Sequence, residues 1–401
     1  MSHDHSNHEE LGLDATGLFD RRSLLKIGAA AAGAAAVTGF GEVPANAASW
    51  SEKLGTLKIG YLPITDASPL LIAHGKGYFE SKGVNVAKPT LFRTWPSIAE
   101  AFAAKHVDVV HLLMPLALQL KFQSQQDIKV IAWNHTDGSA LTVAKSINSV
   151  NDLAGKTVAV PFWYSIHNVV LQQILRKNGL KAITSGDASA TKKEVKLIVL
   201  APADMPAALA SGKVSGFIVA EPFNALAEVN GIGKVLRFSG DVWRDHACCV
   251  TVVRGDLVKN NPEAAQVIVD SIAKAQLWLI GNRPSAATYL SNYLPQAVPA
   301  INKALTDYSS NYNGTAIQHP EWKNERIGFQ PFPYPSYTTE LVKQLRLTTV
   351  DGDNAWLKKI NLNTVHADLV NGKLAESSVN RLGGFVAFGQ KKNVRVETIA
   401  P

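Results

Sequence analysis

The sequence predicts an α/β protein built as two lobes with a hinge between them. Short apolar runs that suit strands alternate with segments that suit helices, and this order repeats from residue 57 onward. Near Lys145 the alternation starts again, which indicates a second α/β unit. Strands that alternate with helices favour parallel-rich sheets flanked by helices. We therefore expect two such sheets, one in each lobe.

The first unit begins with a strand and a helix whose start is marked in the sequence. Residues 57–61 suit a strand, and Ser68 followed by Pro69 marks the N-terminus of a helix at 70–76. A further strand, helix and strand are expected at residues 84–91, 96–105 and 107–112.

The second unit follows the same order. Residues 157–160 suit a strand, and Ser165 is placed to cap the helix that follows it. Apolar residues in that helix recur at the spacing of one buried face. Later elements are expected as strands at 195–200, 214–220 and 249–253 and as helices at 202–210 and 262–279.

The predicted elements place the hinge where the chain passes between the units. We expect these crossings near residues 144–150 and 245–254. Lobe 1 would then contain residues 57–145 with 254–401, and lobe 2 residues 146–253.

Residues 1–47 have the layout of an export signal. Arg21-Arg22 precedes an apolar run at 27–40 and a small-x-small site at 45–47. The run is shorter than the about 20 residues that a membrane span needs. The arginine pair resembles a twin-arginine signal, with a general secretory signal as the alternative. No cysteine precedes Cys248, so we expect a periplasmic protein without a lipid anchor.

Composition narrows the classes of partner. The net charge is +7 and the chain has 2 cysteines, and a positive field favours anionic ligands. Basic residues are spread singly, without the clustered stripe typical of nucleic-acid binding. Cys248 and Cys249 suit either a strained vicinal disulfide or two small residues in a buried strand. We assign no metal and no cofactor.

Three strand-to-helix loops carry the candidate binding residues. Ligands of open α/β sheets lie at the carboxyl ends of strands, where helix N-termini offer N–H donors. Thr65, Asp66, Trp95, Ser165 and His167 occupy such loops. Trp95 suits a ligand wall or a core position, and His167 suits a ligand donor or a cap of its own helix. For His135 a surface loop position is expected.

Several motifs, in the same order, resemble the nitrate/bicarbonate-binding proteins of ABC importers, within the nitrate/sulfonate/bicarbonate solute-binding family. They span residues 57 to 280 and comprise Ile64-Thr65-Asp66-Ala67-Ser68-Pro69, Gly77-Tyr78-Phe79, Trp95, Val160-Pro161, Ser165-Ile166-His167, Glu221-Pro222-Phe223-Asn224-Ala225 and Trp243-Arg244-Asp245-His246. The resemblance implies a two-lobed periplasmic-binding-protein fold that closes on a small ligand and delivers it to an inner-membrane permease. It also implies that Trp95 walls the anion pocket and that His167 donates to the anion.

Departures from the family pattern bear on the ligand. Gly138-Ser139 stands where nitrate binders have Gly-Gln, and Cys249 stands where they have a lysine. A buried lysine contributes about 1.5 to 3 kcal/mol to binding an anion. Specificity for nitrate is therefore not implied, and we expect a small anionic or organic ligand of the nitrate/sulfonate/bicarbonate type, with an organic sulfonate, another oxyanion or a heterocycle at least as well suited as nitrate. Glu221 would either face the cleft or form a salt bridge across the hinge.

The main alternative is a periplasmic enzyme or sensor that shares the fold of thiamine-pyrimidine biosynthetic proteins. The sequence has no H-E-x-x-H, no G-x-S-x-G and no metal-spaced cysteines. We therefore expect a monomeric binding protein without catalytic activity.

Overall fold

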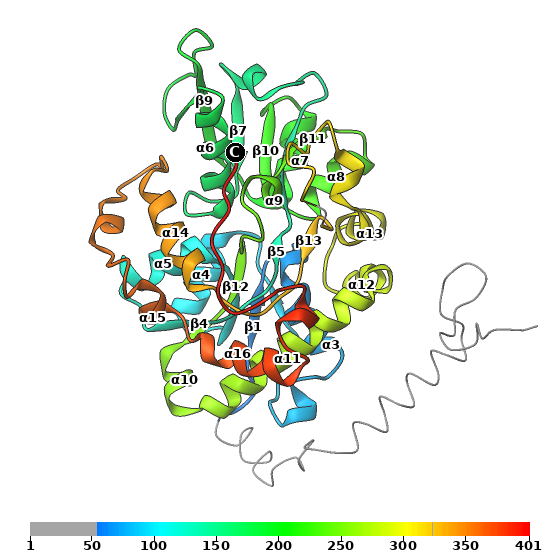
Figure 1. Cartoon of the computed structure of the whole chain (residues 1–401), viewed down its shortest axis with the longest axis vertical. Coiled ribbons are helices and arrows are strands. Elements are labelled where there is room, and N and C mark those ends of the chain that lie inside the picture. The colour runs from blue at the N-terminus through cyan, green and yellow to red at the C-terminus, as the bar shows by residue number, and fades with distance from the viewer. Residues whose placement is uncertain (1–53, 323) are drawn as a thin grey trace, which may run out of the picture. The chain divides into compact units, whose positions relative to one another are not determined.

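The computed structural model describes residues 54–322 and 324–401. The predicted export signal at residues 1–47 lies outside the described residues. Residues Ser49–Pro401 form one compact unit, and its strands build two main sheets and one small one (Figure 1).

The first sheet has five strands in the order β2-β1-β3-β12-β4. Its strands are β1 (Ile59–Tyr61), β2 (Thr90–Leu91), β3 (Val109–Leu113), β4 (Ile128–Trp133) and β12 (Cys249–Arg254). β1 is parallel to β2 and β3, whereas β12 is antiparallel to β3 and β4. A strand from late in the chain thus lies between two strands from its beginning.

The second sheet has six strands in the order β11-β6-β10-β7-β9-β8. Its strands are β6 (Ser139–Val143), β7 (Thr157–Val160), β8 (Lys181–Ile183), β9 (Glu194–Val199), β10 (Gly216–Ala220) and β11 (Lys234–Phe238). β6 is antiparallel to both of its neighbours, and the other pairs are parallel.

The position of β6 differs from the predicted first crossing near residues 144–150. β6 already belongs to the six-stranded sheet, so the chain leaves the five-stranded sheet before Ser139. The turn is made by Asp137 and Gly138, whose φ angles are 57° and 74°. This left-handed backbone suits glycine and is tolerated by aspartate.

Helices surround both sheets. They are α3 (Ser68–Gly75), α4 (Trp95–Ala103), α5 (Met114–Phe122), α6 (Ile166–Lys177), α7 (Met205–Ala210), α8 (Phe223–Val229), α9 (Ser239–Val242), α10 (Gly255–Asn260), α11 (Pro262–Gly281), α12 (Arg283–Leu290), α13 (Val298–Thr306), α14 (Pro335–Arg346), α15 (Val365–Leu369) and α16 (Gly372–Arg381). The predicted cap of α6 is present, because Ser165 Oγ accepts a hydrogen bond from Asn168 N at 3.1 Å. The predicted strand at 84–91 is shorter, and only Thr90–Leu91 joins the sheet.

The segment between α13 and α14 contributes a short sheet between distant parts of the chain. β13 (Ile327–Gly328) pairs antiparallel with β5 (Thr136–Asp137). The preceding helix α13 contacts α8, which follows a strand of the six-stranded sheet. Part of the 254–401 segment therefore packs on elements that the prediction placed in lobe 2.

The C-terminal segment crosses the molecule as an extended strap, defined here as residues 389–401 and drawn in red in Figure 1. Tyr334 donates its hydroxyl to Lys392 O at 2.9 Å. Further on, Arg244 N donates to Thr398 O at 3.0 Å, and Ala400 N donates to Val242 O at 2.7 Å. The strap thus joins the segment before α14 to α9.

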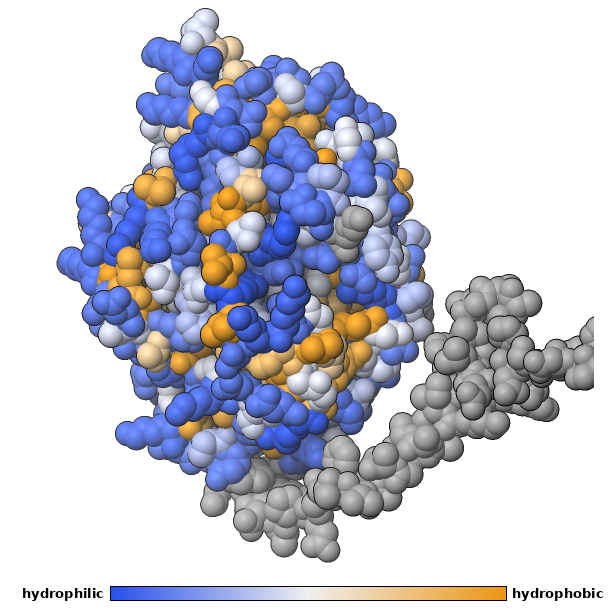
Figure 2. All heavy atoms as spheres, viewed as in Figure 1, coloured by the Kyte–Doolittle hydropathy of each residue, from blue (hydrophilic) through white to orange (hydrophobic). Residues whose placement is uncertain are grey.

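Hydrophilic residues dominate the face shown in Figure 2, with smaller hydrophobic patches between them. Within the described ranges, no helix combines the length and apolar character required to cross a bilayer.

Candidate functional site

Three chain segments converge at one edge of the five-stranded sheet. Asp66 follows β1, His135 follows β4, and Cys249 opens the antiparallel strand β12. Because β12 runs opposite to β1 and β4, its first residue meets their carboxyl ends. Donor atoms of Asp66, His135, Cys248 and Cys249 all lie within 4.8 Å of one another.

Asp66 and His135 form a fully buried pair, with 2.8 Å between Asp66 Oδ2 and His135 Nε2. Burial raises the pKa of Asp66, and His135 partly offsets that effect. Burial alone would lower the pKa of His135, but the Asp66 carboxylate raises it to about 10. The expectation of a surface position for His135 is wrong, because the turn at Asp137-Gly138 folds its ring inward beside Gly138.

The two cysteines are free and buried, with their Sγ atoms 3.5 Å apart. Strand alternation does not separate the thiols, since Cys248 precedes β12 and only Cys249 belongs to it. Burial opposes ionisation of Cys248, yet contacts with Cys249 and His167 lower its pKa. Burial raises the pKa of Cys249.

Ser139 and His167 come from different elements and meet in the interior. Ser139 Oγ lies 3.0 Å from His167 Nε2, and Cys248 Sγ lies 3.8 Å from the same nitrogen. Ser139 opens β6 and His167 lies in the first turn of α6. The predicted donor therefore faces the thiol pair rather than capping its own helix.

Trp95 is buried at the start of α4, with its ring 5.7 Å from that of His111. Burial lowers the pKa of His111 and of His246 to about 3 each. Both histidines are therefore neutral at ordinary pH.

Several buried polar atoms around this region have no hydrogen-bond partner within residues 54–322 and 324–401. They are both oxygens of Asp66, Trp95 Nε1, both ring nitrogens of His111 and of His246, and Nδ1 of His167. Native interiors satisfy most such groups. Their concentration in one region indicates a polar site.

Three predicted site residues have structural partners instead. Glu221 binds the buried Arg326, and its backbone oxygen accepts from both N and Oγ1 of Thr65. The sequence left two roles open for Glu221, and the structure shows the salt bridge, with Arg326 as the partner. Ser165 caps α6 and donates its hydroxyl to Phe162 O.

Sequence reasoning missed His111, His135 and Cys248 as members of this cluster. His111 lies within β3, His135 follows β4 and Cys248 directly precedes β12, and that placement was the available signal. Neighbouring residues of a strand point to opposite faces of the sheet, so the prediction of two small residues in a buried strand did not anticipate contact between the two thiols.

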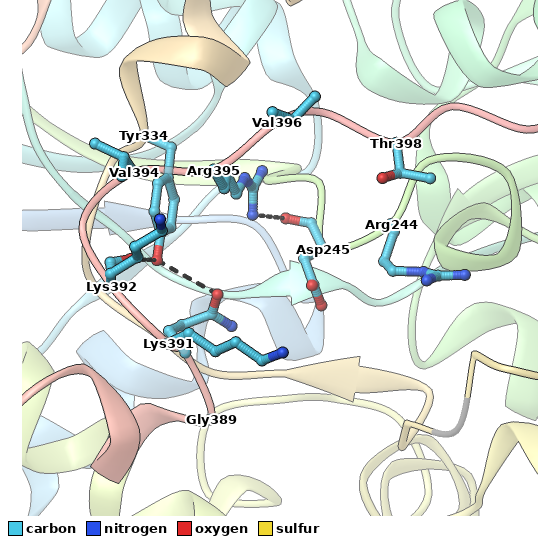
Figure 3. A pocket seen from close by; sticks show the side chains of 11 residues that line it. Arg244, Asp245, Tyr334, Gly389, Lys391, Lys392, Val394, Arg395, Val396 and Thr398 are labelled. Atoms are coloured by element: carbon cyan, nitrogen blue, oxygen red, sulfur yellow. Dashed lines mark hydrogen bonds between the residues drawn. The ribbon is translucent and has the colours of Figure 1, made fainter.

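A separate cavity of about 330 Å³ lies beneath the C-terminal strap (Figure 3). Its lining includes Arg244, Lys391, Lys392 and Arg395. Figure 3 shows Arg395 directed toward Asp245, whose backbone oxygen it binds at 3.0 Å. None of the predicted site residues lines this cavity.

Comparisons with known proteins agree with the fold. Residues 51–293 match the NMT1-like family. The nitrate/nitrite binding protein NrtA of Nostoc sp. is 27% identical over 242 residues, covering 55% of this chain and 53% of that protein. The chain thus spans about half the length of the first curated relatives that it matches, with 53% and 48% of their lengths covered.

Two solved structures are similar throughout most of the chain. The periplasmic nitrate-binding protein NrtA from Synechocystis superposes with a TM-score of 0.70 at 20% identity, covering 86% of this chain and 93% of that one. The ligand-binding component of an ABC-type import system from Staphylococcus aureus, with zinc bound, gives 0.64 at 23% identity and covers 80% and 98%.

These likenesses confirm the predicted two-lobed α/β periplasmic-binding-protein fold. They also confirm the resemblance to nitrate/sulfonate/bicarbonate-binding proteins. Because the matched segment covers more than half of the sequence, the chain belongs to the NMT1-like family.

Proposed function

We propose that this protein is the periplasmic solute-binding component of an ABC importer and passes its ligand to an inner-membrane permease. Family membership and the likeness to NrtA support this role. The observation that carries the proposal is the group of buried, unpartnered polar atoms around Asp66, Trp95 and His167. Such atoms cost about 1 to 3 kcal/mol each when left unsatisfied, so a bound ligand would stabilise them.

The ligand is held between two lobes that open and close about a hinge. Lobe 1 is built on the five-stranded sheet and lobe 2 on the six-stranded sheet. Lobe 1 keeps its predicted residues, 57–145 with 254–401, except for β6. Lobe 2 contains β6 together with the predicted residues 146–253. Asp137-Gly138 and the segment before β12 are the crossings.

Trp95, Ser139, His167 and Cys249 form the ligand-facing set. Asp66 and Gly138 border it, and Thr65, Ser165 and Glu221 hold its walls in place. The site differs from one for a bare anion, because the positive charge that His135 could offer is paired with Asp66. The buried Arg326 is held by Glu221 and Glu228. A sulfonate, another oxyanion with an organic part, or a heterocycle fits this set better than nitrate.

We also propose that the protein is exported through the twin-arginine pathway and that it is a monomer. The paired arginines at residues 21 and 22 support the first. Neither nucleic acid nor a cofactor is required for ligand capture.

A thermal-shift screen tests this function. The panel holds nitrate, bicarbonate with calcium, taurine, alkanesulfonates and pyrimidine or flavin-type heterocycles. A ligand at 100 times its dissociation constant adds about 2.7 kcal/mol of stability, which raises the melting temperature by a few degrees.

His167→Gln should abolish the shift, and His366→Gln, at a distant half-buried histidine, should keep it. A shift with nitrate alone would contradict the ligand class. A shift that survives in His167→Gln would contradict the site.

A further inference from the structure

Four donor side chains meet where no metal was expected from the sequence. Asp66, His135, Cys248 and Cys249 are fully buried, and their donor atoms lie within 4.8 Å of one another. They belong to three separate segments of the chain, so the fold itself brings them together. Two sulfurs, one imidazole nitrogen and one carboxylate oxygen are the donor types of tetrahedral zinc sites.

The hydrogen bonds around His135 indicate which ring nitrogen carries a lone pair. Cys249 N donates to His135 Nε2 at 3.3 Å. On the other side of the ring, Nδ1 lies 3.4 Å from Thr136 O. Once the proton that His135 shares with Asp66 has left Nε2, the neutral ring keeps its proton on Nδ1 and has its lone pair on Nε2. A metal-binding histidine commonly donates its second ring N–H to a backbone carbonyl in this way.

The lone pair of His135 Nε2 then faces a carboxylate oxygen. Asp66 Oδ2 is 2.8 Å away, and Asp66 Oδ1 has no hydrogen-bond partner among the described residues. A proton between the two groups is one way to join them. A cation bound by both atoms is another, and it also accounts for the two sulfurs beside them.

The thiols complete the set. Their Sγ atoms are 3.5 Å apart, a separation that two thiolates on one tetrahedral ion can adopt with metal–sulfur bonds of about 2.3 Å. Cys248 Sγ is also 3.8 Å from His167 Nε2, so a positive ring or N–H can support the thiolate from the side of α6. The donor set excludes magnesium and calcium, which prefer oxygen.

We propose that Asp66, His135, Cys248 and Cys249 bind a single thiophilic divalent cation of the zinc class. The two thiols and Nε2 of His135 lose their protons when the ion binds, and these protons pass to solvent. Metal–sulfur bonds form at Cys248 and Cys249, and the ion also binds His135 Nε2 and an oxygen of Asp66. No change of oxidation state is involved. This inference goes beyond the solute-binding role. The metal site shares Cys249 and Asp66 with the proposed ligand site, but binding of the ion does not require that the protein serves a permease.

Cobalt titration of the reduced full-length protein tests the site. Co²⁺ in a tetrahedral thiolate site gives intense visible bands and a near-ultraviolet sulfur-to-cobalt transition. Because the chain has 2 cysteines in all, that transition can arise only from Cys248 and Cys249. We expect saturation at one equivalent, and loss of the bands when Zn²⁺ is added.

Variants separate the site from other metal-binding groups. Cys249→Ser and His135→Gln should each weaken binding at least about 100-fold, more than loss of an outer-shell contact does. His74→Gln, at a histidine bound to Tyr293, should leave it unchanged. A chain with His3, His5 and His8 all replaced by Gln should also keep the thiolate band.

Two outcomes would overturn the proposal. One is Co²⁺ binding without a sulfur-to-cobalt transition in protein whose two thiols have been shown to be reduced. The other is Zn²⁺ affinity that persists in the Cys248→Ser/Cys249→Ser variant with a native circular dichroism spectrum. Both results concern metal binding alone, whereas the organic-ligand screen on metal-free wild-type protein tests the solute-binding role, so the two failures are distinguishable.

Discussion

Arg326 donates from Nε to Glu221 Oε1 over 2.8 Å, and both side chains are fully buried. The pair joins the segment just before β13 to the segment just after β10. Glu228 provides a second carboxylate at 2.6 Å from Arg326 Nη1. Burial raises the pKa of Glu221, and Arg326 partly offsets that effect. Burial alone would lower the pKa of Arg326, but Glu221 and Glu228 raise it above its usual range.

Arg326→Gln is expected to destabilise the protein strongly. Removing one partner of a buried ion pair leaves an uncompensated charge, which costs about 3 to 5 kcal/mol. Urea unfolding followed by circular dichroism measures the loss. Arg244→Gln is the matched control, because the Arg244–Glu321 pair is exposed and should contribute about 0 to 1 kcal/mol. Equal effects of the two variants would contradict the structural role of Arg326.

Gly138→Ala is expected to destabilise the turn that directs His135 inward. Gly138 has φ of 74°, and an added Cβ would lie 3.0 Å from both His135 Nδ1 and Ile327 Cγ1. The backbone strain alone costs about 1 to 2 kcal/mol, and the two contacts add to it. Gly179→Ala separates these effects, since Gly179 has φ of 70° with nothing within 4 Å. A melting-temperature loss no larger than that of Gly179→Ala would show that the contacts do not matter.

Stability is expected to fall as the pH drops from about 6.5 toward 4, with a contribution from His366. Burial lowers the pKa of His366 to about 4, whereas the unfolded chain has the ordinary value of about 6.5. Between these values the unfolded state binds a proton that the folded state does not, so this contribution is fully present above pH 6.5 and is lost on acidification. Allowing for partial exposure, the loss is about 1 kcal/mol.

His366→Gln tests that assignment, because it removes the titrating group. The difference in unfolding free energy between wild type and variant should change across pH 4 to 6.5 and stay constant above it. A constant difference over the whole range would assign the acid sensitivity to other groups.

Ending the chain after Asn393 is expected to lower the melting temperature by several degrees. The deletion removes Glu397, which accepts from Trp243 Nε1 at 2.9 Å, and the backbone contacts of Thr398 and Ala400. Each lost hydrogen bond costs about 1 kcal/mol. Trp243 fluorescence should also shift to longer wavelength as the ring gains solvent. An unchanged spectrum and melting temperature would show that the strap does not stabilise α9.

Local signals were sufficient to predict much of the fold. The strand at 157–160 and the Ser165 cap match β7 and the start of α6, because short-range hydrophobicity and capping chemistry determine both. Membership of β6 in the six-stranded sheet could not be predicted in this way. It depends on the φ angle of Asp137, a non-glycine residue that the sequence does not mark as left-handed.

The candidate site was also only partly predictable from the sequence. Trp95 and His167 lie in loops whose position relative to the strands is readable from the sequence, and both are buried near the cluster. His135 and Cys248 depend on how the chain turns just after β4 and just before β12. Those turns are set by packing between segments more than 100 residues apart, which no local pattern records.

The insertion of β12 between β3 and β4 has a consequence for synthesis on the ribosome. By Phe238 every strand of the six-stranded sheet has been made, whereas the five-stranded sheet lacks β12 until Arg254. N-terminal units usually fold first as a chain emerges. In this protein the order is reversed: the sheet that begins later in the sequence is complete first, and β4 leaves the ribosome more than 100 residues before the strand that joins it to its sheet.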